Sequence, residues 1–213
     1  MQLESAVPPL RLSFRREARE RAIETAFAIT VEQGWEAVRL TDVAVRVGVS
    51  RPVLYKEFGS KQGLGEAVWG REVERFLSGL LGALGAVGAD VAAGIEAAVD
   101  HTLRSADSNP LLHAVLTGDP AGGDTLLPLL TVRSGPMLAA CTAALGGWLA
   151  ARVPAWSGEE IEVAVDSLVR LTVSHLVTPA GPPEVVAPRL AAVALRYLGV
   201  PTDGAPVVGG PAS

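Results

Sequence analysis

The stretch GVSRPVLYKEFGSKQGL, residues 48–64, contains the features that decide the fold. Its proline, Pro52, lies just inside what the pattern predicts to be a short helix. A proline in the first helical turn costs no helical hydrogen bond, because the N–H groups there have no intrahelical partner. The stretch also carries Arg51, Lys56 and Lys61 in a chain whose formal net charge is −5. The basic residues are therefore concentrated locally, although the chain as a whole is acidic.

Two short helices are predicted on either side of a tight turn. Thr41 is placed to cap the first, the segment DVAVRVG over residues 42–48, and Ser50 to cap the second, over residues 51–58. Gly48 lies at the end of the first helix, where a residue in the left-handed conformation is needed for the turn. Two short helices joined by a tight, glycine-containing turn define a helix-turn-helix, whose second helix enters the major groove of DNA.

Outward-facing side chains of this motif have the chemistry of DNA contacts. Arg51 and Lys56 lie on or near the outer face of the second helix; an arginine can bridge O6 and N7 of guanine, and a lysine can reach the same atoms or a phosphate. The hydroxyl, phenol and ammonium groups of Thr41, Tyr55 and Lys61 suit phosphate oxygens. The residues predicted to contact double-stranded DNA are Thr41, Ser50, Arg51, Pro52, Val53, Tyr55, Lys56 and Lys61.

The rest of the chain is also predicted to be helical. Apolar residues recur at helical spacing, and no run keeps the period of two that indicates a half-buried strand. Pro136 breaks one long pattern near residues 134–136, and Ser157 followed by acids is typical of a helix start. The predicted fold class is all-α, with about nine helices. Besides the two helices of the motif, helices are expected over residues 13–33, 60–84, 90–106, 110–117, 124–152, 158–178 and 184–198.

Composition excludes several classes of protein. Apolar residues make up 49% of the 213 residues, which is ample for a core and excludes a wholly disordered chain. No apolar run reaches the roughly 18 residues of a membrane span, and the N-terminus has no signal-peptide pattern, so a cytoplasmic protein is expected. A single cysteine, Cys141, excludes an internal disulfide and a cysteine metal cluster. No metal and no cofactor are expected.

Charge is distributed unevenly along the chain. Residues 1–75 hold 12 Lys+Arg and 11 Asp+Glu, a net charge of +1, whereas residues 76–213 hold 6 and 12, a net charge of −6. This uneven distribution indicates two separate functions in one chain, although a chance distribution of solvated side chains would give the same pattern.

The segment LTDVAVRVGVSRPVLYKEFGSKQGL, residues 40–64, closely resembles the signature of TetR-family transcriptional regulators. The resemblance covers about residues 15–65 and includes the helix upstream of the motif. Glu57 departs mildly from the residues common at its position, and as an acid near phosphates it is assigned no DNA contact. The matching residues are Ala26, Phe27, Gly34, Thr41, Val43, Ala44, Gly48, Val49, Ser50, Leu54, Tyr55, Phe58, Ser60, Lys61 and Leu64.

The resemblance implies a homodimer, most often a repressor, with two N-terminal heads on a palindromic DNA operator. It implies a C-terminal domain that binds a small effector and forms the dimer through its last two helices. The expected organisation is a flexible arm (1–12), a DNA-binding domain (13–60), a ligand-binding and dimerisation domain (61–199) and a disordered tail (200–213). For the last two helices, an ordinary intramolecular core is the alternative interpretation. The predicted dimer residues are Ile161, Val165, Leu168, Val186, Leu190, Val193 and Tyr197.

Residues 77–176 are unusually apolar and poor in charge. A helical domain with many alanine and glycine positions can leave a cavity between helices. The predicted effector is therefore apolar or amphipathic, such as an acyl chain or a lipophilic drug. Each candidate for the cavity wall also suits an ordinary structural role. The candidates are Trp69, Phe76, Leu112, His113, Leu116, Met137, Cys141, Trp148 and His175.

Other functions were weighed against a regulator. The three histidines, His101, His113 and His175, are widely spaced, and no familiar catalytic or phosphate-binding motif is present, so no enzymatic activity is expected. A DNA-binding adaptor of the same fold that acts through a protein partner is a second alternative, and an activator is a third. The sequence does not separate these two from a repressor.

Overall fold

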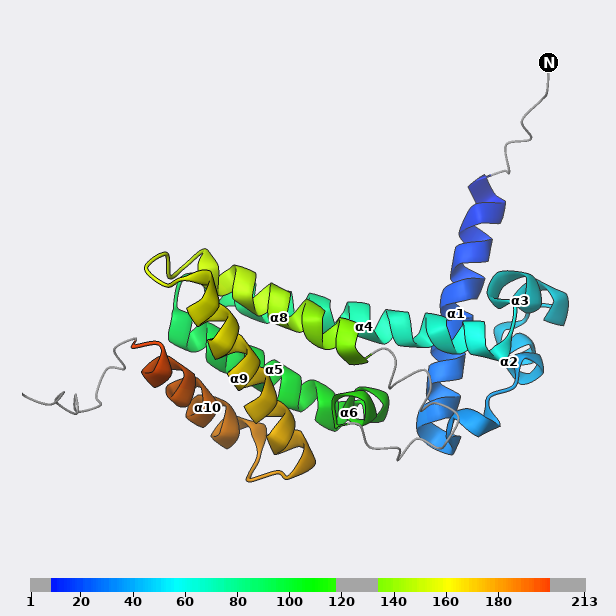
Figure 1. Cartoon of the computed structure of the whole chain (residues 1–213). Coiled ribbons are helices and arrows are strands. Elements are labelled where there is room, and N and C mark those ends of the chain that lie inside the picture. Colours follow the sequence, from blue (N-terminus) through cyan, green and yellow to red (C-terminus); the bar gives the residue numbers. More distant parts are fainter. Residues whose placement is uncertain (1–8, 118–133, 200–213) are drawn as a thin grey trace, which may run out of the picture. The chain divides into compact units, whose positions relative to one another are not determined.

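A computed structural model describes residues 9–117 and 134–199. Helices are the regular elements of these ranges, and no strand occurs in them, so the predicted all-α class is confirmed (Figure 1). Within the same ranges, no helix is long and apolar enough to cross a membrane. The helices of the described residues are α1 (Pro9–Gln33), α2 (Leu40–Val47), α3 (Arg51–Phe58), α4 (Lys61–Ala86), α5 (Val91–Ser108), α6 (Pro110–Thr117), α8 (Ser134–Ala150), α9 (Gly158–Val177) and α10 (Pro183–Tyr197), with a 3-10 turn, η1 (Trp35–Ala37).

The described residues form two compact units, and the division between them falls within helix α4, after Glu74. This is later than the predicted domain boundary at residues 60–61. The first turns of α4 belong to the first unit, where the Arg71 guanidinium carbon lies 5.7 Å from the centre of the Phe27 ring of α1. Helix α4 is therefore the one element that contributes residues to both units among the described parts of the chain.

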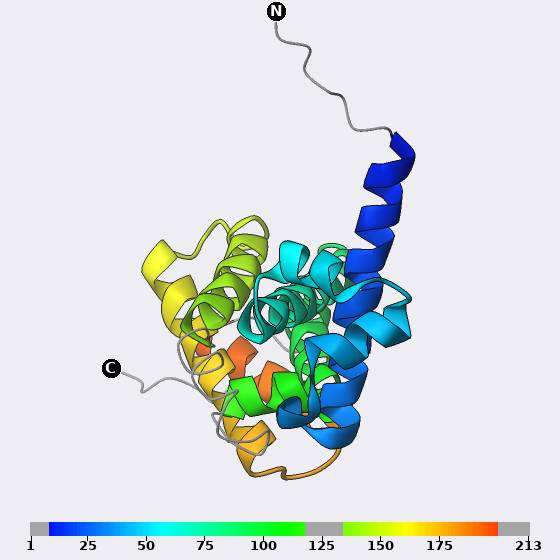
Figure 2. The same ribbon diagram turned by 90° about the vertical axis from the view of Figure 1, so that its right-hand side faces the viewer.

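The first unit is built on α1, against which α2 and α3 pack. These helices are the blue to cyan ribbons of Figure 2. Their inward side chains are apolar and buried: Ala22 and Ile23 on α1, Val43 on α2, and Leu54 and Phe58 on α3. Because this apolar surface is removed from water, the two short helices are held at a fixed angle, and the outer face of α3 is held with them.

Gly48 ends α2 in the left-handed conformation, with φ 77° and ψ 32°. A residue with a side chain would be sterically disfavoured there. The Gly48 N–H donates to the carbonyls of Ala44 (3.0 Å) and Val45 (3.2 Å), and the Val49 N–H donates to the Ala44 carbonyl (3.0 Å). These bonds satisfy carbonyls at the helix end. The predicted turn glycine of the helix-turn-helix is confirmed.

Helix α1 is longer than predicted. It begins at Pro9 rather than at Ser13, because a proline fits the first turn of a helix without loss of a hydrogen bond. The predicted flexible arm is therefore helical from Pro9 onward. The remainder of that arm, the beginning of the helix predicted over residues 124–152 and the predicted tail fall on residues 1–8, 118–133 and 200–213, outside the described part of the chain.

Helix α2 begins one residue before its predicted cap, so the prediction that Thr41 caps it is wrong. The Arg39 carbonyl accepts the N–H of Val43 at 3.0 Å, and Arg39 therefore holds the N-cap position. Thr41 lies inside the first turn, where its hydroxyl donates to the Asp42 carboxylate at 3.2 Å.

The starts of α3 and α4 are held differently. Ser50 holds the predicted N-cap position of α3, but its side chain makes no capping hydrogen bond. The hydroxyl oxygen of Ser60 accepts the N–H of Gly63 at 3.1 Å and so caps α4. Gly63 also lies so close to the Phe58 carbonyl that a Cβ would overlap it. The end of α3 is thus packed tightly against the beginning of α4.

The second unit is a helical bundle centred on α5. Helix α5 packs against α6, α9 and α10, and α9 also packs against α8 and α10 (Figure 1). Among the described residues of this unit, three helix starts are capped by side chains. Asp90 accepts the Ala93 N–H at 3.0 Å at the start of α5, Asn109 Oδ1 accepts the N–H groups of Leu111 (3.1 Å) and Leu112 (3.3 Å) at the start of α6, and Ser157 with Glu160 forms a capping box on α9. The predicted start at Ser157 is confirmed.

Candidate DNA interface and ligand cavity

The residues predicted to contact DNA all belong to the first unit, and the structure exposes most of them. Leu54 and Phe58 form the buried side of α3, which leaves the opposite side of this short helix open to solvent. Lys61, at the start of α4, is partly buried. The exposed members of the predicted set are Thr41, Ser50, Arg51, Pro52, Val53, Tyr55 and Lys56.

Four of the eight residues predicted to contact DNA line one open hollow of the first unit. Thr41 comes from α2, Arg51 and Tyr55 come from α3, and Lys61 comes from α4. The Arg51 guanidinium carbon lies 5.0 Å from the centre of the Tyr55 ring, and Arg51 Nη2 donates to the phenol oxygen at 3.3 Å. Hydroxyl, phenol and cationic groups in one hollow match the oxygens of a phosphate backbone. The remaining lining residues are Glu36, Val38, Arg39, Leu40 and Ser60.

Lys61 has a structural contact that the sequence did not reveal. Its ammonium group donates to the Glu36 carbonyl at 3.2 Å and lies 3.9 Å from a Glu36 carboxylate oxygen. The same group lies 5.3 Å from the centre of the Trp35 ring. Lys61 therefore ties the start of α4 to η1, and its charge is partly balanced before any phosphate approaches.

Lys56 and Val53 line a different groove, which lies between α1 and α3 and is called the α1–α3 groove below. Glu57, on the same helix, is bound there by two arginines of α1. The groove thus combines one lysine of the predicted DNA face with two further basic side chains that the motif did not contain. Its lining residues are Phe14, Arg15, Ala18, Arg19, Val53, Leu54, Lys56 and Glu57.

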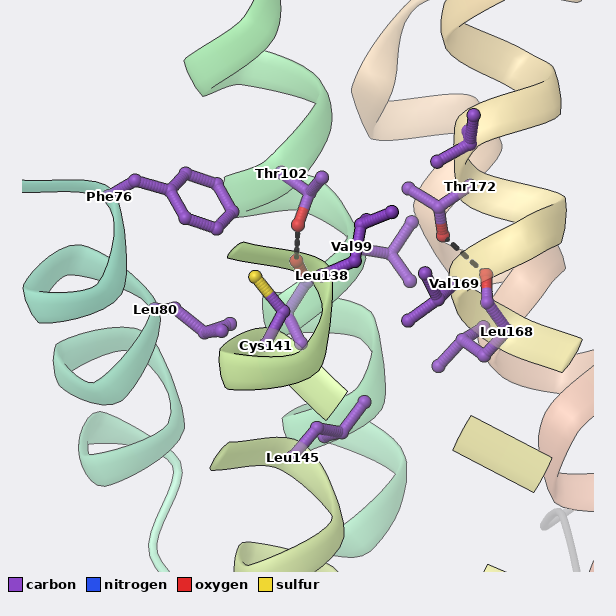
Figure 3. A pocket seen from close by; sticks show the side chains of 12 residues that line it. Phe76, Leu80, Val99, Thr102, Leu138, Cys141, Leu145, Leu168, Val169 and Thr172 are labelled. Atoms are coloured by element: carbon purple, nitrogen blue, oxygen red, sulfur yellow. Dashed lines mark hydrogen bonds between the residues drawn. The ribbon is translucent and has the colours of Figure 1, made fainter. Parts of the chain in front are cut away.

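The second unit contains an apolar cavity among α4, α5, α8 and α9 (Figure 3). Figure 3 shows Phe76 and Leu80 on one side, Cys141 and Leu145 of α8 between, and side chains of α9 opposite. The cavity volume is about 50 Å³, and it reaches about 490 Å³ only when all the space between the wall atoms and the adjoining solvent is counted. The lining residues are Phe76, Leu80, Ala98, Val99, Thr102, Leu138, Cys141, Leu145, Leu168, Val169, Thr172 and Val173.

Among the described residues of the cavity wall none carries a charged side chain, and their polar groups are already occupied or neutral. The hydroxyls of Thr102 and Thr172 donate to the carbonyls of Ala98 and Leu168, each at 2.8 Å. Burial raises the pKa of the Cys141 thiol to about 11, so this group stays a neutral thiol at physiological pH. A ligand in the cavity would therefore meet mainly methyl, methylene and ring surfaces.

Of the nine side chains predicted to form the cavity wall, the structure places Phe76 and Cys141 in it. Trp69 belongs to the first unit. Leu112 and Met137 are buried in the second unit but do not line this cavity, and neither does His113. The side chain of Leu116 lies outside the described residues.

Trp148 packs the bundle instead of lining the cavity. Its ring lies against Gly94 of α5, where a Cβ would overlap the indole. The indole N–H donates to the Leu84 carbonyl at 3.1 Å, and the Arg152 guanidinium carbon lies 4.1 Å from the ring centre. His175 also lies away from the cavity; its Nδ1 is buried and makes no hydrogen bond with the described residues.

Some of the cavity residues that the prediction missed carried a signal in the sequence. Leu138 and Leu145 lie three residues before and four residues after the predicted Cys141, which places all three on one face of α8. Leu80 likewise lies four residues after the predicted Phe76 on α4. Such a stripe indicates an inward face, but it does not say whether the face meets a neighbour or an open space.

The predicted dimer residues divide into two groups. Val193 and Tyr197 are 49% and 61% exposed and are available to a partner. The other five are buried within the single chain, where α9 and α10 pack inside the unit, so their apolar surface is already removed from water without a partner. The buried five are Ile161, Val165, Leu168, Val186 and Leu190. Large apolar residues that α9 and α10 do expose are Val163, Leu171, Val177, Val185, Val193 and Tyr197.

A helix-turn-helix with an exposed second helix, joined in one chain to a helical unit with an apolar cavity, defines a DNA-binding transcriptional regulator. Two family models match this chain. The model for bacterial regulatory proteins of the tetR family matches residues 22–68, and the model for the C-terminal domain of the bacterial tetracyclin repressor matches residues 90–196. The chain belongs to the TetR family, whose members bind DNA and small-molecule effectors, typically as dimers.

Individual relatives agree with this assignment. The HTH-type transcriptional regulator AlkX of Mycobacterium tuberculosis is 29% identical over 162 residues, covering 76% of this chain and 75% of that protein. The transcriptional activator FasR of Mycolicibacterium smegmatis is 40% identical over 70 residues, 33% of this chain and 32% of that protein. The crystal structure of the TetR family repressor AlkX from Dietzia sp., implicated in biodegradation of n-alkanes, has a TM-score of 0.60 at 26% identity and covers 84% of this chain and 96% of its own.

Proposed function

We propose that this protein is a homodimeric repressor that leaves a palindromic operator when an uncharged, hydrophobic effector occupies the cavity of the second unit. The observation that carries the proposal is the chemistry of the cavity wall. The wall is apolar, its hydroxyls are bonded to backbone carbonyls, and its one thiol is neutral. A charged group placed there would lose its hydration without gaining a partner.

The DNA side of the proposal rests on the exposed face of α3. Arg51 and Lys56 are exposed on the helix that a helix-turn-helix places in the major groove. Thr41, Tyr55 and Lys61 surround the hollow at its base and suit phosphates. The role of Pro52 is to begin α3 at low conformational cost, since it stands in the first helical turn.

Coupling between the two functions would act through α4. Lys61, at its first residue, borders the hollow of the first unit, while Phe76 and Leu80 line the cavity of the second. A ligand shifts the balance between two conformations only by the difference in its affinity for them. An effector that packs on Phe76 and Leu80 would favour one tilt of α4 and so one spacing of the two heads, which must match the roughly 34–36 Å repeat of the major groove.

Dimer formation would use the exposed apolar side chains of α9 and α10. Val193 and Tyr197 remain from the prediction, and Leu171 and Val177 of α9 are exposed as well. A two-fold axis through such a surface would place the same patch on both partners and present two recognition helices to the two halves of a palindrome.

The named relatives help to choose the effector class and to decide between a repressor and an activator. One related repressor is implicated in biodegradation of n-alkanes, which favours a long-chain, uncharged effector here. Other relatives include an activator and a repressor, so an activator is the second candidate. A reporter fused to the selected operator separates them, because deletion of the gene raises expression for a repressor and lowers it for an activator.

The effector proposal is tested with a matched chain series. An operator is selected in vitro from random duplexes, and its complex is titrated with 1-decanol, methyl decanoate and sodium decanoate. The uncharged compounds are expected to release DNA and to slow alkylation of Cys141, which reports directly on the cavity, while the carboxylate does neither. If only hydrophilic or charged compounds release DNA, the proposal fails.

A cavity-filling variant gives the control. Leu138→Trp would occupy the cavity, so the protein should still bind DNA but need at least tenfold more 1-decanol for release. Leu81→Trp adds the same ring at an exposed position of α4, where Leu81 is 55% exposed, and should respond like the natural chain.

A further inference from the structure

Glu57 lies on the recognition helix but faces α1 instead of the solvent. Its side chain is 16% exposed. One carboxylate oxygen accepts from Arg15 Nε at 2.7 Å, and the other lies 3.3 Å from Arg19 Nε. Arg19 is further held by the Phe58 ring, whose centre lies 5.5 Å from its guanidinium carbon. A single acid of α3 thus binds two cations of α1.

These cations stand beside the DNA-facing surface. Arg15, Arg19 and Lys56 line the same α1–α3 groove, and Lys56 is a predicted base or phosphate contact. Among the described residues Lys56 makes no ion pair. The groove therefore holds one cation without an ion pair among the described residues and two that are paired with Glu57. The side chains of Arg15 and Arg19 remain 57% and 40% exposed, and Arg19 also lies 3.9 Å from a Glu20 carboxylate oxygen.

We propose that Glu57 is a positioning residue that sets DNA specificity: it fixes α3 on α1 and withholds Arg15 and Arg19 from the phosphate backbone. The inference rests on the proposed DNA-binding function. Phosphate contacts strengthen binding to any sequence, whereas base contacts distinguish sequences. An acid that removes two cations from the phosphate-binding set lowers affinity for random DNA while leaving the base contacts of α3 in place.

The test measures the salt dependence of binding to a random-sequence duplex. Each phosphate contact contributes about −0.9 to the slope of log K against log salt concentration. Glu57→Gln keeps the size of the side chain but removes the charge that holds both arginines. The slope is expected to steepen by about 1.8, so that affinity lost between 50 and 200 mM salt increases roughly tenfold. The preference for the selected operator over random DNA should fall.

Two comparisons separate this from a general change of charge. Glu32→Gln removes one negative charge from an exposed position of α1 in the same unit, outside both the hollow and the α1–α3 groove, and should leave the slope nearly unchanged. In an Arg15→Gln/Arg19→Gln background, Glu57→Gln should add no more than Glu32→Gln does. Equal slopes for Glu57→Gln and Glu32→Gln, or the same steepening without the arginines, would overturn the inference.

The double arginine variant also tests the idea if Glu57→Gln does not fold. Because both arginines are withheld in the natural chain, Arg15→Gln/Arg19→Gln should leave the salt slope on random DNA unchanged. A shallower slope would mean that the arginines already contact phosphates, and the inference would be wrong. Failure of the natural chain to bind any DNA would instead reject the proposed function itself.

Discussion

The two units differ in what fills the space between their helices. In the first unit the inward side chains of α2 and α3, such as Val43 and Leu54, are buried against neighbouring helices. In the second unit Leu138 and Cys141 of α8 border an open, apolar cavity. The same kind of helical surface thus forms a close-packed core in one unit and the wall of a cavity in the other.

The difference matches what the proposed function requires of each unit. A recognition helix must hold its side chains in one geometry against base edges, and close packing resists displacement. A receptor must admit a ligand and change shape when it does, so some of its apolar surface has to be left without a protein partner. Close packing is seen at the α3–α4 junction, where Gly63 lies against the Phe58 carbonyl. Unfilled space is seen beside Leu138, which lines the cavity of the second unit.

The largest expected effect comes from removing the same side chain in each unit. Leu64→Ala should destabilise the protein by about 2–5 kcal/mol, because Leu64 of the first unit is fully buried and lines neither the hollow nor the α1–α3 groove, so its loss leaves a new cavity in a filled core. Leu138→Ala should cost less than half as much, because Leu138 is partly exposed and already borders open space. Urea denaturation followed by helical circular dichroism measures both. Equal losses would show that the cavity wall is as closely packed as the core of the first unit.

The next effect concerns DNA contacts and uses the first unit alone. Arg51→Ala or Lys56→Ala should weaken binding to the selected operator by about 1–3 kcal/mol and leave random DNA less affected, if these residues contact bases. Lys61→Ala should weaken both duplexes alike and reduce the salt slope by about 1 or less, because its ammonium group is partly balanced by Glu36. Fluorescence anisotropy at several salt concentrations gives these values.

A matched charge variant sharpens that comparison. Arg21→Ala removes an exposed cation of α1 that lines neither the hollow nor the α1–α3 groove, so it should change operator affinity least. Losses that are identical on operator and random DNA would reduce Arg51 and Lys56 to phosphate contacts.

The helix-turn-helix could be predicted from the sequence because its constraints are local. Gly48 adopts a conformation that favours glycine, and within a helix Pro52 fits the first turn without loss of a hydrogen bond, so neighbouring residues determine the element. The predicted cap at Thr41 lies two residues after the observed cap at Arg39, because the spacing allows Leu40 to end the preceding link or to begin α2. Glu57 was missed because its partners, Arg15 and Arg19, are distant in the sequence.

The second unit was predicted less well because the positions of its side chains depend on contacts between helices that are distant in the sequence. Ile161 and Leu168 lie on an apolar face of α9 that could meet either this chain or a partner, and spacing alone does not distinguish the two. The sequence likewise proposed Trp148 for the cavity, whereas Gly94 on another helix gives its ring a place in the bundle. Whether the apolar face of a helix lines the cavity depends on residues of other helices, which only the fold brings together.

The smallest expected effect is at the start of α9, on the surface of the second unit. Ser157→Ala removes an N-cap hydroxyl that accepts the Glu160 N–H at 3.2 Å, and should lower the stability of this unit by about 1 kcal/mol. Leu54 and the rest of the helix-turn-helix are not involved, so operator binding should be unchanged at temperatures where both units are folded. A loss of DNA affinity there would mean that the two units depend on each other more than their separate cores imply.

The pH dependence of this cap has a definite sign. The Ser157 backbone N–H and hydroxyl donate to the Glu160 carboxylate at 2.7 and 2.9 Å, and these bonds lower the pKa of Glu160. A carboxyl with a lowered pKa stabilises the fold fully above its ordinary pKa, and loses that contribution as pH falls through the lowered value. The natural chain should therefore be more stable than Glu160→Gln at neutral pH, and thermal denaturation should show the difference shrinking in acid. A difference that stays constant across this range would mean that the amide replaces the carboxylate fully, and that the hydrogen bonds of the capping box matter here more than its charge.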